Sequence, residues 1–166
     1  MCTEAEETVH RALRQAEITY TRHAHPPVFT VEEAEREWGA IPGAHCKNLF
    51  LRNKKGNHHY LVILLSAKRV DIRLLERLLG EDRLSFGSAE RLMEHLGLEA
   101  GAVSPFGLLH DGSHAVRVVI DQDLKTYQQV SFHPNVNTAT ITLSVADFQR
   151  FLASCGTPVR YLAFPA

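Results

Sequence analysis

The segment 101–108, which reads Gly-Ala-Val-Ser-Pro-Phe-Gly-Leu, has a glycine near each end of an otherwise mostly apolar stretch. Because glycine has no side chain, a ligand can approach its backbone closely. Pro105 has no N–H group and pushes Ser104 out of the helical conformation. The three amides that follow are then candidates to face an acceptor such as a carbonyl or phosphate oxygen. They belong to Phe106, Gly107 and Leu108. The alternative is a plain turn, because proline and glycine are above all turn residues.

A second set of polar residues lies at the start of an apolar strand. Lys47 shares a strand face with Leu49 and Leu51, which is an unusual place for an ammonium group if that face is covered. Lys47 either reaches water from the edge of the sheet or supplies a fixed charge to a site. Asn48 faces the other way in an ideal strand. Lys47 and Asn48 therefore serve one site only if the strand is irregular, and otherwise Asn48 caps the strand end.

A third polar group follows another apolar strand. Pro134 ends that strand and leaves the His133 imidazole beside a turn. His133 is either structural or a hydrogen-bond partner for the amino group, the carbonyl or the attacking water of a reaction. Asn135, Asn137 and Thr138 can orient the turn through side-chain to backbone bonds, as such residues do in any loop.

Length and composition describe an ordinary globular protein. The 166 residues predict one domain, residues 1–166, that buries about two-thirds of its unfolded surface. Hydrophobic residues at 45% and charged residues at 22% are typical of soluble proteins. No apolar run reaches the roughly 18 residues of a membrane span, and the acidic start Met1–Glu7 is unlike a signal peptide. We therefore expect a cytoplasmic protein without a membrane contact.

The cysteines and the charge exclude further classes. Cys2, Cys46 and Cys155 are odd in number, far apart and without a Cys-x-x-Cys pair, so neither a disulfide framework nor a cysteine zinc site is expected. We interpret Cys46 as a core residue. The net charge of −1 excludes a generally basic duplex binder but permits local contact with one end of a nucleic acid. The candidate phosphate contacts are Arg52, Lys54 and Lys55 at a hairpin tip, with Lys68 and Arg69 after the next strand.

The elements that position these residues follow from periodicity and capping. Helices are predicted from caps at Thr3 and Thr30, over Asp71–Leu79 and Ser88–Leu96, and from a cap at Ser144 to about Ser154. Strands are predicted at Ile18–Tyr20, Leu49–Leu51, Tyr60–Leu65, Leu84–Phe86, Ala115–Ile120, Gln128–Phe132, Thr138–Leu143 and Val159–Ala163. This order predicts an α/β (α+β) fold with a mixed, largely antiparallel sheet and helices packed over it. The helix after Thr30, followed by a glycine-containing connection, is either a lid or a plain link to the next strand.

Three separated segments together resemble a known family. They are Pro42-Gly-Ala-His-Cys-Lys47-Asn48-Leu-Phe-Leu51, the 101–108 loop, and Phe132-His133-Pro134-Asn135-Val136-Asn137-Thr138-Ala139-Thr140. In this order they resemble the prolyl-tRNA synthetase-associated editing domains of the YbaK/ProX superfamily of aminoacyl-tRNA deacylases. The strand and the His-Pro segment look most like the free-standing ProXp-ala type. The resemblance runs from the segment Pro26-Pro27-Val28-Phe29-Thr30 to the final strand.

The resemblance implies a YbaK-like fold and hydrolysis of the ester that joins an amino acid to the terminal adenosine of a tRNA. The lysine matching Lys47 is the family residue most closely tied to deacylation, so Lys47 would hold the terminal phosphate or polarise the ester carbonyl. Asn48 and His133 complete the expected catalytic group. A positioned water, the amides of the 101–108 loop and the vicinal ribose hydroxyl would suffice without a serine or cysteine nucleophile, a metal or a cofactor. The expected substrate-binding residues are Gly101, Val103, Ser104, Pro105, Phe106, Gly107, Leu108, Asn135 and Thr138, with Val103, Phe106 and Leu108 as pocket wall or simply as core.

The implied substrate is alanine mischarged on the proline tRNA, whose acceptor end would be the partner, with prolyl-tRNA synthetase or an elongation factor as possible transient partners. A synthetase built for proline rejects the smaller alanine poorly, because a missing methylene changes binding by only about 1–3 kcal/mol. A second site that is too small for proline could remove the error. Cysteinyl-tRNA(Pro) or another misacylated tRNA is the alternative substrate.

Two other functional classes are compatible with the residues. One is a metal-dependent hydrolase, suggested by 10 histidines that include His23, His25, His58 and His59. The other is a module that binds a tRNA or docks on a synthetase without chemistry.

Overall fold

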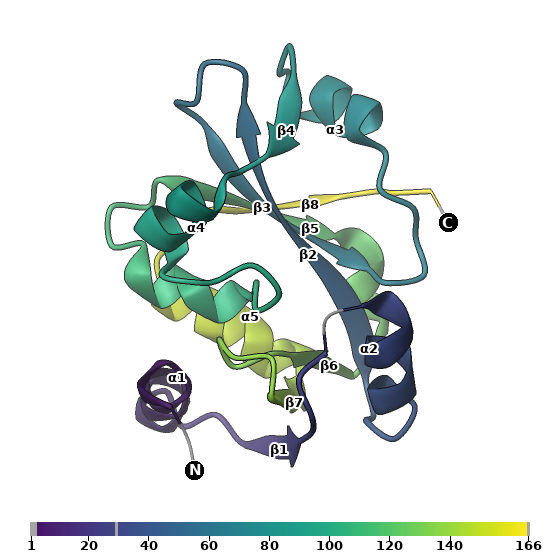
Figure 1. Ribbon diagram of the computed structural model, residues 1–166, viewed down its shortest axis with the longest axis vertical. Helices are drawn as coiled ribbons and strands as arrows, with labels where there is room; N and C mark the ends of the chain where they lie inside the picture. Colours follow the sequence, from purple (N-terminus) through teal and green to yellow (C-terminus); the bar gives the residue numbers. More distant parts are fainter. Residues whose placement is uncertain (1–2, 29, 166) are drawn as a thin grey trace.

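The computed structural model describes residues 3–28 and 30–165. Within these ranges the chain forms an eight-stranded sheet in the order β1-β7-β6-β2-β3-β5-β8, with β4 paired to β2 (Figure 1). The strands are β1 (Tyr20–Ala24), β2 (Ala44–Asn53), β3 (His59–Leu65), β4 (Leu84–Phe86), β5 (Val116–Asp121), β6 (Gln129–Phe132), β7 (Ala139–Ser144) and β8 (Val159–Leu162). The pairs β1–β7, β2–β3, β2–β4 and β6–β7 are antiparallel, whereas β2–β6, β3–β5 and β5–β8 are parallel. The predicted mixed sheet is confirmed.

Five α-helices and two short 3-10 helices surround the sheet in the described part of the chain. They are α1 (Glu4–Gln15), α2 (Val31–Trp38), α3 (Ile72–Leu79), α4 (Ala89–Leu96), α5 (Val145–Ser154), η1 (Pro105–His110) and η2 (Gln122–Thr126). Thr3, Thr30 and Ser144, which were predicted as N-caps, each accept a hydrogen bond from the amide three residues ahead. No described helix combines the length and the apolar character that crossing a bilayer requires.

The starts of two strands differ by two residues or more from the sequence-based expectation. The first strand begins at Tyr20 rather than Ile18, because the Ile18 amide still bonds the Leu13 carbonyl at the end of α1 and Glu17 has a φ of 56°. The central strand β2 begins five residues before the expected Leu49, at Ala44, because its first residues pair with β6. Phe29 and Cys2 lie outside the described residues.

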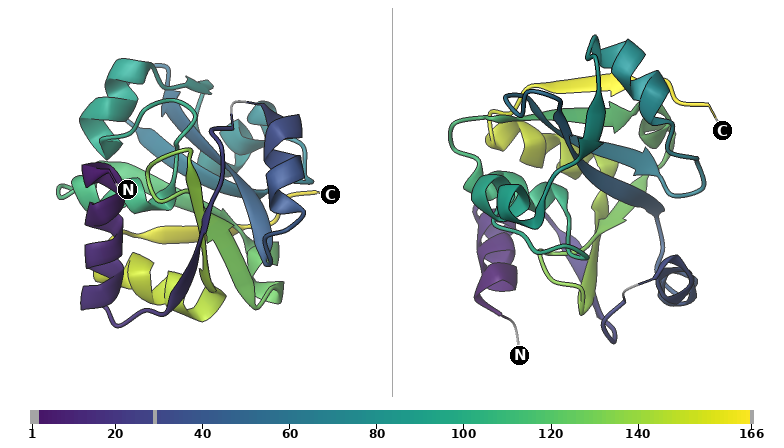
Figure 2. Two further views of the ribbon diagram at one scale, coloured as in Figure 1. Left: turned by 60° about the horizontal axis from the view of Figure 1, so that its bottom comes forward. Right: turned by 45° about the horizontal axis from the view of Figure 1, so that its top comes forward.

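The sheet buries a hydrophobic cluster on each face. The larger cluster joins α1, α4, α5 and η1 to one face, and Phe106, Phe132 and Phe151 lie at its centre. The smaller cluster lies under α3 on the other face and includes Leu51 and Leu75. The views in Figure 2 show α1, α4 and α5 gathered on one side of the long β2–β3 pair, with α3 apart from them. Cys46 is buried in the larger cluster, as predicted.

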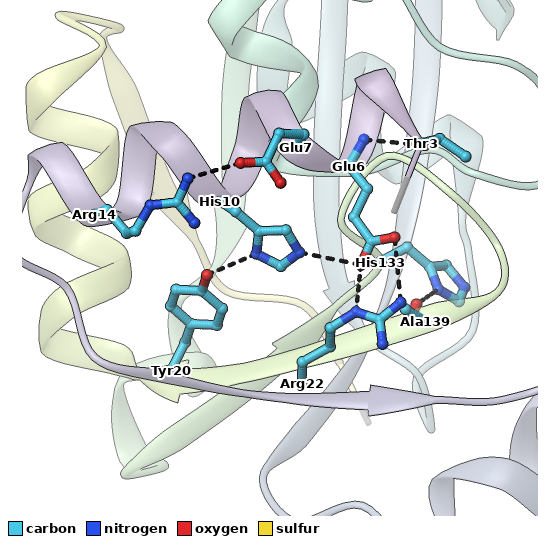
Figure 3. A network of polar contacts seen from close by, with 9 residues as sticks. All are labelled: Thr3, Glu6, Glu7, His10, Arg14, Tyr20, Arg22, His133 and Ala139. Carbon is cyan, nitrogen blue, oxygen red and sulfur yellow. Dashed lines mark hydrogen bonds and ion pairs between the residues drawn. The ribbon is translucent and has the colours of Figure 1, made fainter. Parts of the chain in front are cut away.

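Helix α1 is joined to β1 by a buried polar network (Figure 3). Glu6 is 1% exposed and accepts hydrogen bonds from His10 Nε2 at 3.1 Å and from Arg22 Nε at 2.5 Å. Tyr20 Oη lies 2.6 Å from His10 Nδ1. Burial alone would raise the pKa of Glu6, but the hydrogen bonds and charges of Arg22 and His10 outweigh it and lower that pKa. The Glu6 side chain therefore fixes the helix to the sheet.

Lys68 was predicted as a phosphate contact, and this prediction is wrong. The residue is only 6% exposed. Its ammonium group donates to Asp121 Oδ1 at 2.9 Å, to Asp123 Oδ2 at 2.7 Å and to the Phe164 carbonyl at 2.8 Å. Burial alone would lower the pKa of Lys68, but the two carboxylates raise it. Lys68 is thus an interior cation that ties the turn after β3 to η2 and to the segment after β8.

Replacing Lys68 tests this structural role. Lys68→Met should lower the free energy of unfolding by about 3 kcal/mol, because Asp121, which is 1% exposed, would keep its charge without its cation. Urea denaturation followed by circular dichroism measures the change. Lys54→Met, at the exposed hairpin tip, is the matched control and should change stability by less than about 0.5 kcal/mol. Equal stabilities of the two variants would contradict the assignment.

His59, at the start of β3, is buried among aromatic and basic groups. Its ring stacks on Phe50 with centroids 5.7 Å apart and lies 4.1 Å from the ring of His95. Arg91 Nη1 lies 3.0 Å from His59 Nε2, and because a guanidinium only donates, this nitrogen must accept. Burial lowers the pKa of His59 from 6.5 to about 4, and the neighbouring His95, Arg91 and Arg52 add to this shift. The native protein therefore holds His59 neutral.

Acid should consequently destabilise the fold. The unfolded chain binds a proton at His59 near pH 6.5 and the folded chain only near pH 4, so the unfolded state gains protons first as the pH falls. The stability contributed by neutral His59 is present above pH 6.5 and is lost as the pH falls through about 4. Urea denaturation over this pH range should show the decline, and His59→Gln should make it shallower. His110→Gln, at an exposed position, should not.

Candidate functional site

The candidate site lies where β2 and β6 separate. These parallel strands pair over only two positions, with Ala44 opposite Val130 and His45 opposite Ser131. Lys47 lies two residues beyond His45 on β2, and His133 lies two residues beyond Ser131, just after β6 ends. Two of the three predicted catalytic residues therefore come from neighbouring strands at the same end of their shared ladder.

The Lys47 ammonium group is held by the main chain. Its Nζ donates to the carbonyl of Lys68 at 2.6 Å. Within residues 3–28 and 30–165, no carboxylate forms a salt bridge with Lys47, in contrast to the two that bind Lys68. An ammonium group has three donors, so two remain for other acceptors. Lys47 thus presents an uncompensated positive charge at a fixed place.

Asn48 does not share a face with Lys47. The β2–β3 ladder is regular from Cys46 to Arg52, so successive side chains alternate. Asn48 therefore lies on the side of Cys46 and Phe50, over the larger cluster, and its Oδ1 is buried without a hydrogen-bond partner among the described residues. The strand irregularity that would bring Lys47 and Asn48 to one site is absent from the described ladder.

His133 is half-buried, and a backbone carbonyl fixes the position of its ring proton. Its Nδ1 lies 2.9 Å from the Ala139 carbonyl, which can only accept, so Nδ1 carries the hydrogen (Figure 3). Burial lowers the pKa of His133, the Ala139 bond opposes this shift, and nearby His25 adds to it. In the neutral ring, Nε2 is left with a lone pair that can accept a hydrogen bond.

The turn after His133 borders a cavity of about 550 Å³. Asn135 has a φ of 62°, a left-handed conformation that asparagine tolerates better than most residues. It is 7% exposed, and its Oδ1 has no hydrogen-bond partner in the described chain. Asn135 and Thr138, both predicted substrate-binding residues, line the cavity together with Ala102. Asn137 also lines it and donates weakly to the Val28 carbonyl at 3.5 Å.

The 101–108 segment differs from the expected ligand-binding loop. Pro105–His110 is a 3-10 helix, and Ser104 is its N-cap. The Phe106 amide donates to Ser104 Oγ and the Gly107 amide to the Ser104 carbonyl, each at 3.1 Å. The prediction that both amides are free for a ligand is therefore wrong, because the serine before the proline satisfies them.

The side chains of this segment divide between the core and the cavity. Phe106 is fully buried and Leu108 is 3% exposed, so both lie in the larger cluster rather than on a pocket wall. Ser104 and Pro105 are also buried, while Val103 is half-buried against the cluster. A Cβ atom on Gly107 would lie 2.6 Å from Leu98, so this glycine permits close packing. Gly101, with a φ of 90° and open space around it, keeps an accessible backbone.

The predicted phosphate contacts lie at opposite ends of the β2–β3 hairpin. Lys54 and Lys55 are exposed at the tip, and Arg52 donates to the Asn53 and Lys54 carbonyls of that turn. The tip is six residues, or about 20 Å of extended strand, from Lys47. Arg69 is exposed next to Lys68, whose carbonyl binds Lys47. Among the exposed cations of this set, Arg69 is the one at the Lys47 end of the hairpin.

Sequence reasoning missed His45 and Trp38. Their rings stack with centroids 4.9 Å apart and an interplanar angle of 17°. His45 shares a strand face with Lys47, so the alternation of β2 was a signal that could have identified it. Trp38 lies at the end of α2 and not in β2, so strand alternation does not identify it. Only the folded chain brings its ring to His45.

Three of the four histidines proposed for the metal-dependent alternative have other partners, whereas His23 Nε2 is buried without a hydrogen-bond partner among the described residues. His25 bonds Thr140 and the Pro26 carbonyl, His58 pairs with Glu81, and His59 contacts Arg91. No group of three or more histidine, cysteine, aspartate or glutamate side chains in the described ranges is placed to hold a metal ion.

Solved structures share this fold. A crystal structure described as a candidate trans-editing enzyme for prolyl-tRNA synthetase aligns over 99% of this chain and 100% of its own, with a TM-score of 0.73 and 24% identity. The crystal structure of hypothetical protein APE2540 aligns over 92% of this chain and 97% of its own, with a TM-score of 0.71 and 21% identity. At these identities the likeness concerns the fold alone.

Sequence relatives and a family model define the family. The prolyl-tRNA editing protein ProX of Acetoanaerobium sticklandii is 40% identical over 156 residues, which are 94% of this chain and 95% of the relative. The prolyl-tRNA synthetase associated domain-containing protein 1 of Bos taurus is 35% identical over 136 residues, which are 80% of this chain and 79% of the relative. The model of the aminoacyl-tRNA editing domain matches residues 25–151. With that match and these relatives, the chain belongs to the aminoacyl-tRNA editing domain family.

Proposed function

We propose that this protein is a trans-editing deacylase that hydrolyses the ester of alanine mischarged on the proline tRNA. Family membership makes it an aminoacyl-tRNA hydrolase, and the names of its relatives point to errors of prolyl-tRNA synthetase. The observation that carries the proposal is the Lys47 ammonium group, which is fixed by the Lys68 carbonyl and has no carboxylate partner in the described chain. The acceptor end of the tRNA is then the macromolecular partner.

Lys47 supplies positive charge to the reaction. Its two remaining donors can bind the terminal phosphate or the carbonyl oxygen of the ester. In the second arrangement the charge polarises the carbonyl and stabilises the oxyanion that forms when water attacks. Because the ammonium group is already oriented by a main-chain acceptor, little reorganisation is needed when the substrate arrives.

His133 accepts a hydrogen bond in the same reaction. With Nδ1–H committed to the Ala139 carbonyl, Nε2 can accept from the attacking water or from the substrate's amino group. Water attacks the carbonyl carbon of the ester, the bond to the ribose oxygen breaks, and the proton that the water loses passes to that oxygen, which leaves as the ribose hydroxyl. The vicinal ribose hydroxyl is well placed to share that proton.

The aminoacyl group occupies the cavity beside Asn135. The unpartnered Oδ1 of this residue can accept from the α-ammonium group of the substrate. Asn135 is held in a left-handed turn and is largely buried, so its carbonyl is oriented before binding. The cavity of about 550 Å³ exceeds an alanyl group and has room for part of the terminal ribose.

Lys47→Ala should keep the fold and lose most of the activity. The substitution removes one hydrogen bond to a main-chain carbonyl, so stability should change by no more than about 1–2 kcal/mol. The loss of a fixed charge beside a developing oxyanion should reduce the rate by about 100-fold or more. Deacylation of alanyl-tRNA(Pro) under catalytic enzyme concentrations, beside prolyl- and cysteinyl-tRNA(Pro), measures it.

Lys55→Ala is the matched control for this experiment, because it removes an exposed lysine at the other end of the hairpin. Hydrolysis of the alanyl ester alone supports the substrate assignment. Hydrolysis of the cysteinyl ester alone would move the substrate to cysteine on the same tRNA. Unchanged turnover by Lys47→Ala would refute its catalytic role, and no turnover by the wild type would favour a binding module.

The pH dependence of deacylation should report His133. Because burial lowers the pKa of His133, its Nε2 stays unprotonated at neutral pH and the catalysed rate should hold until the pH falls below about 6.5. Further acidification protonates the ring and should reduce the single-turnover rate. His133→Gln should lower the rate and remove this decline. Circular dichroism at each pH separates titration from unfolding, and the uncatalysed hydrolysis rate is subtracted. An acid limb that persists in His133→Gln would assign the titration to another group.

A further inference from the structure

A second cavity, of about 320 Å³, is lined by His45, which shares a strand face with Lys47, and by Lys68, whose carbonyl binds the Lys47 ammonium group. It is formed by the end of α2, the start of β2, the turn after β3 and the residue that follows η2. Its lining residues are Trp38, Gly43, Ala44, His45, Leu65, Ser66, Ala67, Lys68 and Tyr127. The lining is largely apolar and aromatic, which suits a flat ring better than a charged group.

Two aromatic side chains border this cavity. Trp38 is half-buried with its ring stacked on His45, and Tyr127 is 45% exposed. Among the described residues, three large hydrophobic side chains are strongly exposed, and Tyr127 is the one of these three beside this cavity. Unpaired nucleobases bind proteins by stacking on such rings.

The cavity also offers a directional polar group. His45 Nε2 lies 3.0 Å from the Ile41 carbonyl, so this nitrogen carries the hydrogen. Burial lowers the pKa of His45 and keeps the ring neutral. Nδ1 is then an acceptor, and no described residue donates to it. The exocyclic amino group of adenine is a donor of the matching kind, whereas the corresponding group of uracil is an acceptor.

The second cavity lies next to Lys47 along β2. His45, which lines this cavity, precedes Lys47 by two residues, or about 7 Å of extended strand, and shares a strand face with it. Asn135, in the first cavity, follows His133 by two residues. Each cavity therefore has a lining residue that is two positions along the chain from one of the proposed catalytic residues.

We infer that the second cavity binds the terminal adenine of the tRNA, stacked against Trp38 and Tyr127 with its amino group on His45 Nδ1. The inference rests on the proposed function, because it takes the aminoacyl ester to lie at Lys47. One nucleotide then spans the site, with the base in the second cavity, the ester at Lys47 and the amino acid beside Asn135. Arg69, exposed next to Lys68, lies near the path of the preceding phosphate.

The single tryptophan of the chain makes this arrangement directly measurable. The probe is 3′-deoxy-3′-(L-alanylamino)adenosine, in which an amide replaces the labile ester. Titration of the wild type should quench Trp38 fluorescence in a saturable manner, with excitation at the red edge where adenine does not absorb. The uridine counterpart should bind more weakly, because it presents an acceptor to His45 Nδ1.

Substitutions at Tyr127 test the stacking. Tyr127→Leu should weaken probe binding and raise KM for alanyl-tRNA(Pro) about tenfold with little change in kcat, because stacking is lost equally from the ground and transition states. Tyr127→Phe should retain both values. Phe86→Leu is the matched control, since it removes an exposed aromatic ring opposite Leu51, about 20 Å of strand from His45.

The outcomes separate this inference from the proposed function. Saturable quenching by the adenosine probe in a protein that hydrolyses no aminoacyl ester would support the adenine site and refute the proposed deacylase activity. Active deacylation without any change in Trp38 fluorescence, and with Tyr127→Leu equal to the wild type, would overturn the base site and leave the deacylase standing. Equal binding of the uridine probe would overturn the role of His45.

Discussion

The buried charge of Lys68 is the constraint on which the arrangement of the site depends. An ammonium group this deeply buried persists only if its donors are paired, and here two carboxylates and the Phe164 carbonyl satisfy all three. The main chain of the same residue also contributes, because the Lys68 carbonyl accepts a hydrogen bond from the Lys47 ammonium group. The ion pairs of the buried Lys68 side chain thereby fix the Lys68 carbonyl, which positions the Lys47 ammonium group.

The short parallel ladder between β2 and β6 is the second feature on which the site depends. A two-position parallel ladder joins the halves of the sheet and then ends, so polar residues from both strands can face a shared space without competing for backbone bonds. On the opposite face, Phe132 of β6 packs against Phe106 of η1, which in turn packs against Phe151 of α5. The site is thus open on one side and rigidly supported on the other.

Local features of the sequence were sufficient to predict most of the fold. The caps at Thr3, Thr30 and Ser144 and the continuous apolar run of β3 are encoded within a few residues, so periodicity and capping chemistry identified them. The family resemblance and the mixed sheet were also predicted correctly. Boundaries failed where a distant strand decided them, as at the start of β2.

The site could be predicted only in part, because its members depend on contacts between distant segments. Lys68 looks like a surface lysine in the sequence, and its partner Asp121 is 53 residues away. Phe106 looks like a ligand contact until its ring is seen packed on Phe132 and Phe151. Asn48 was correctly expected to face away from Lys47 in a regular strand, but the sequence could not say that the strand is regular. Burial and pairing, which decide these roles, are properties of the folded chain.

The Phe164 carbonyl has a practical consequence for constructing derivatives of this protein. It is one of three acceptors for the Lys68 ammonium group. The carbonyl of Lys68 in turn binds the Lys47 ammonium group. An affinity tag or fusion partner joined at the C-terminal end would therefore pull on a segment mechanically connected to the catalytic lysine. A tag at the other end would be attached beside Thr3 and Ala5, which line the cavity next to Asn135. Both ends of the described chain are therefore connected to a part of the site.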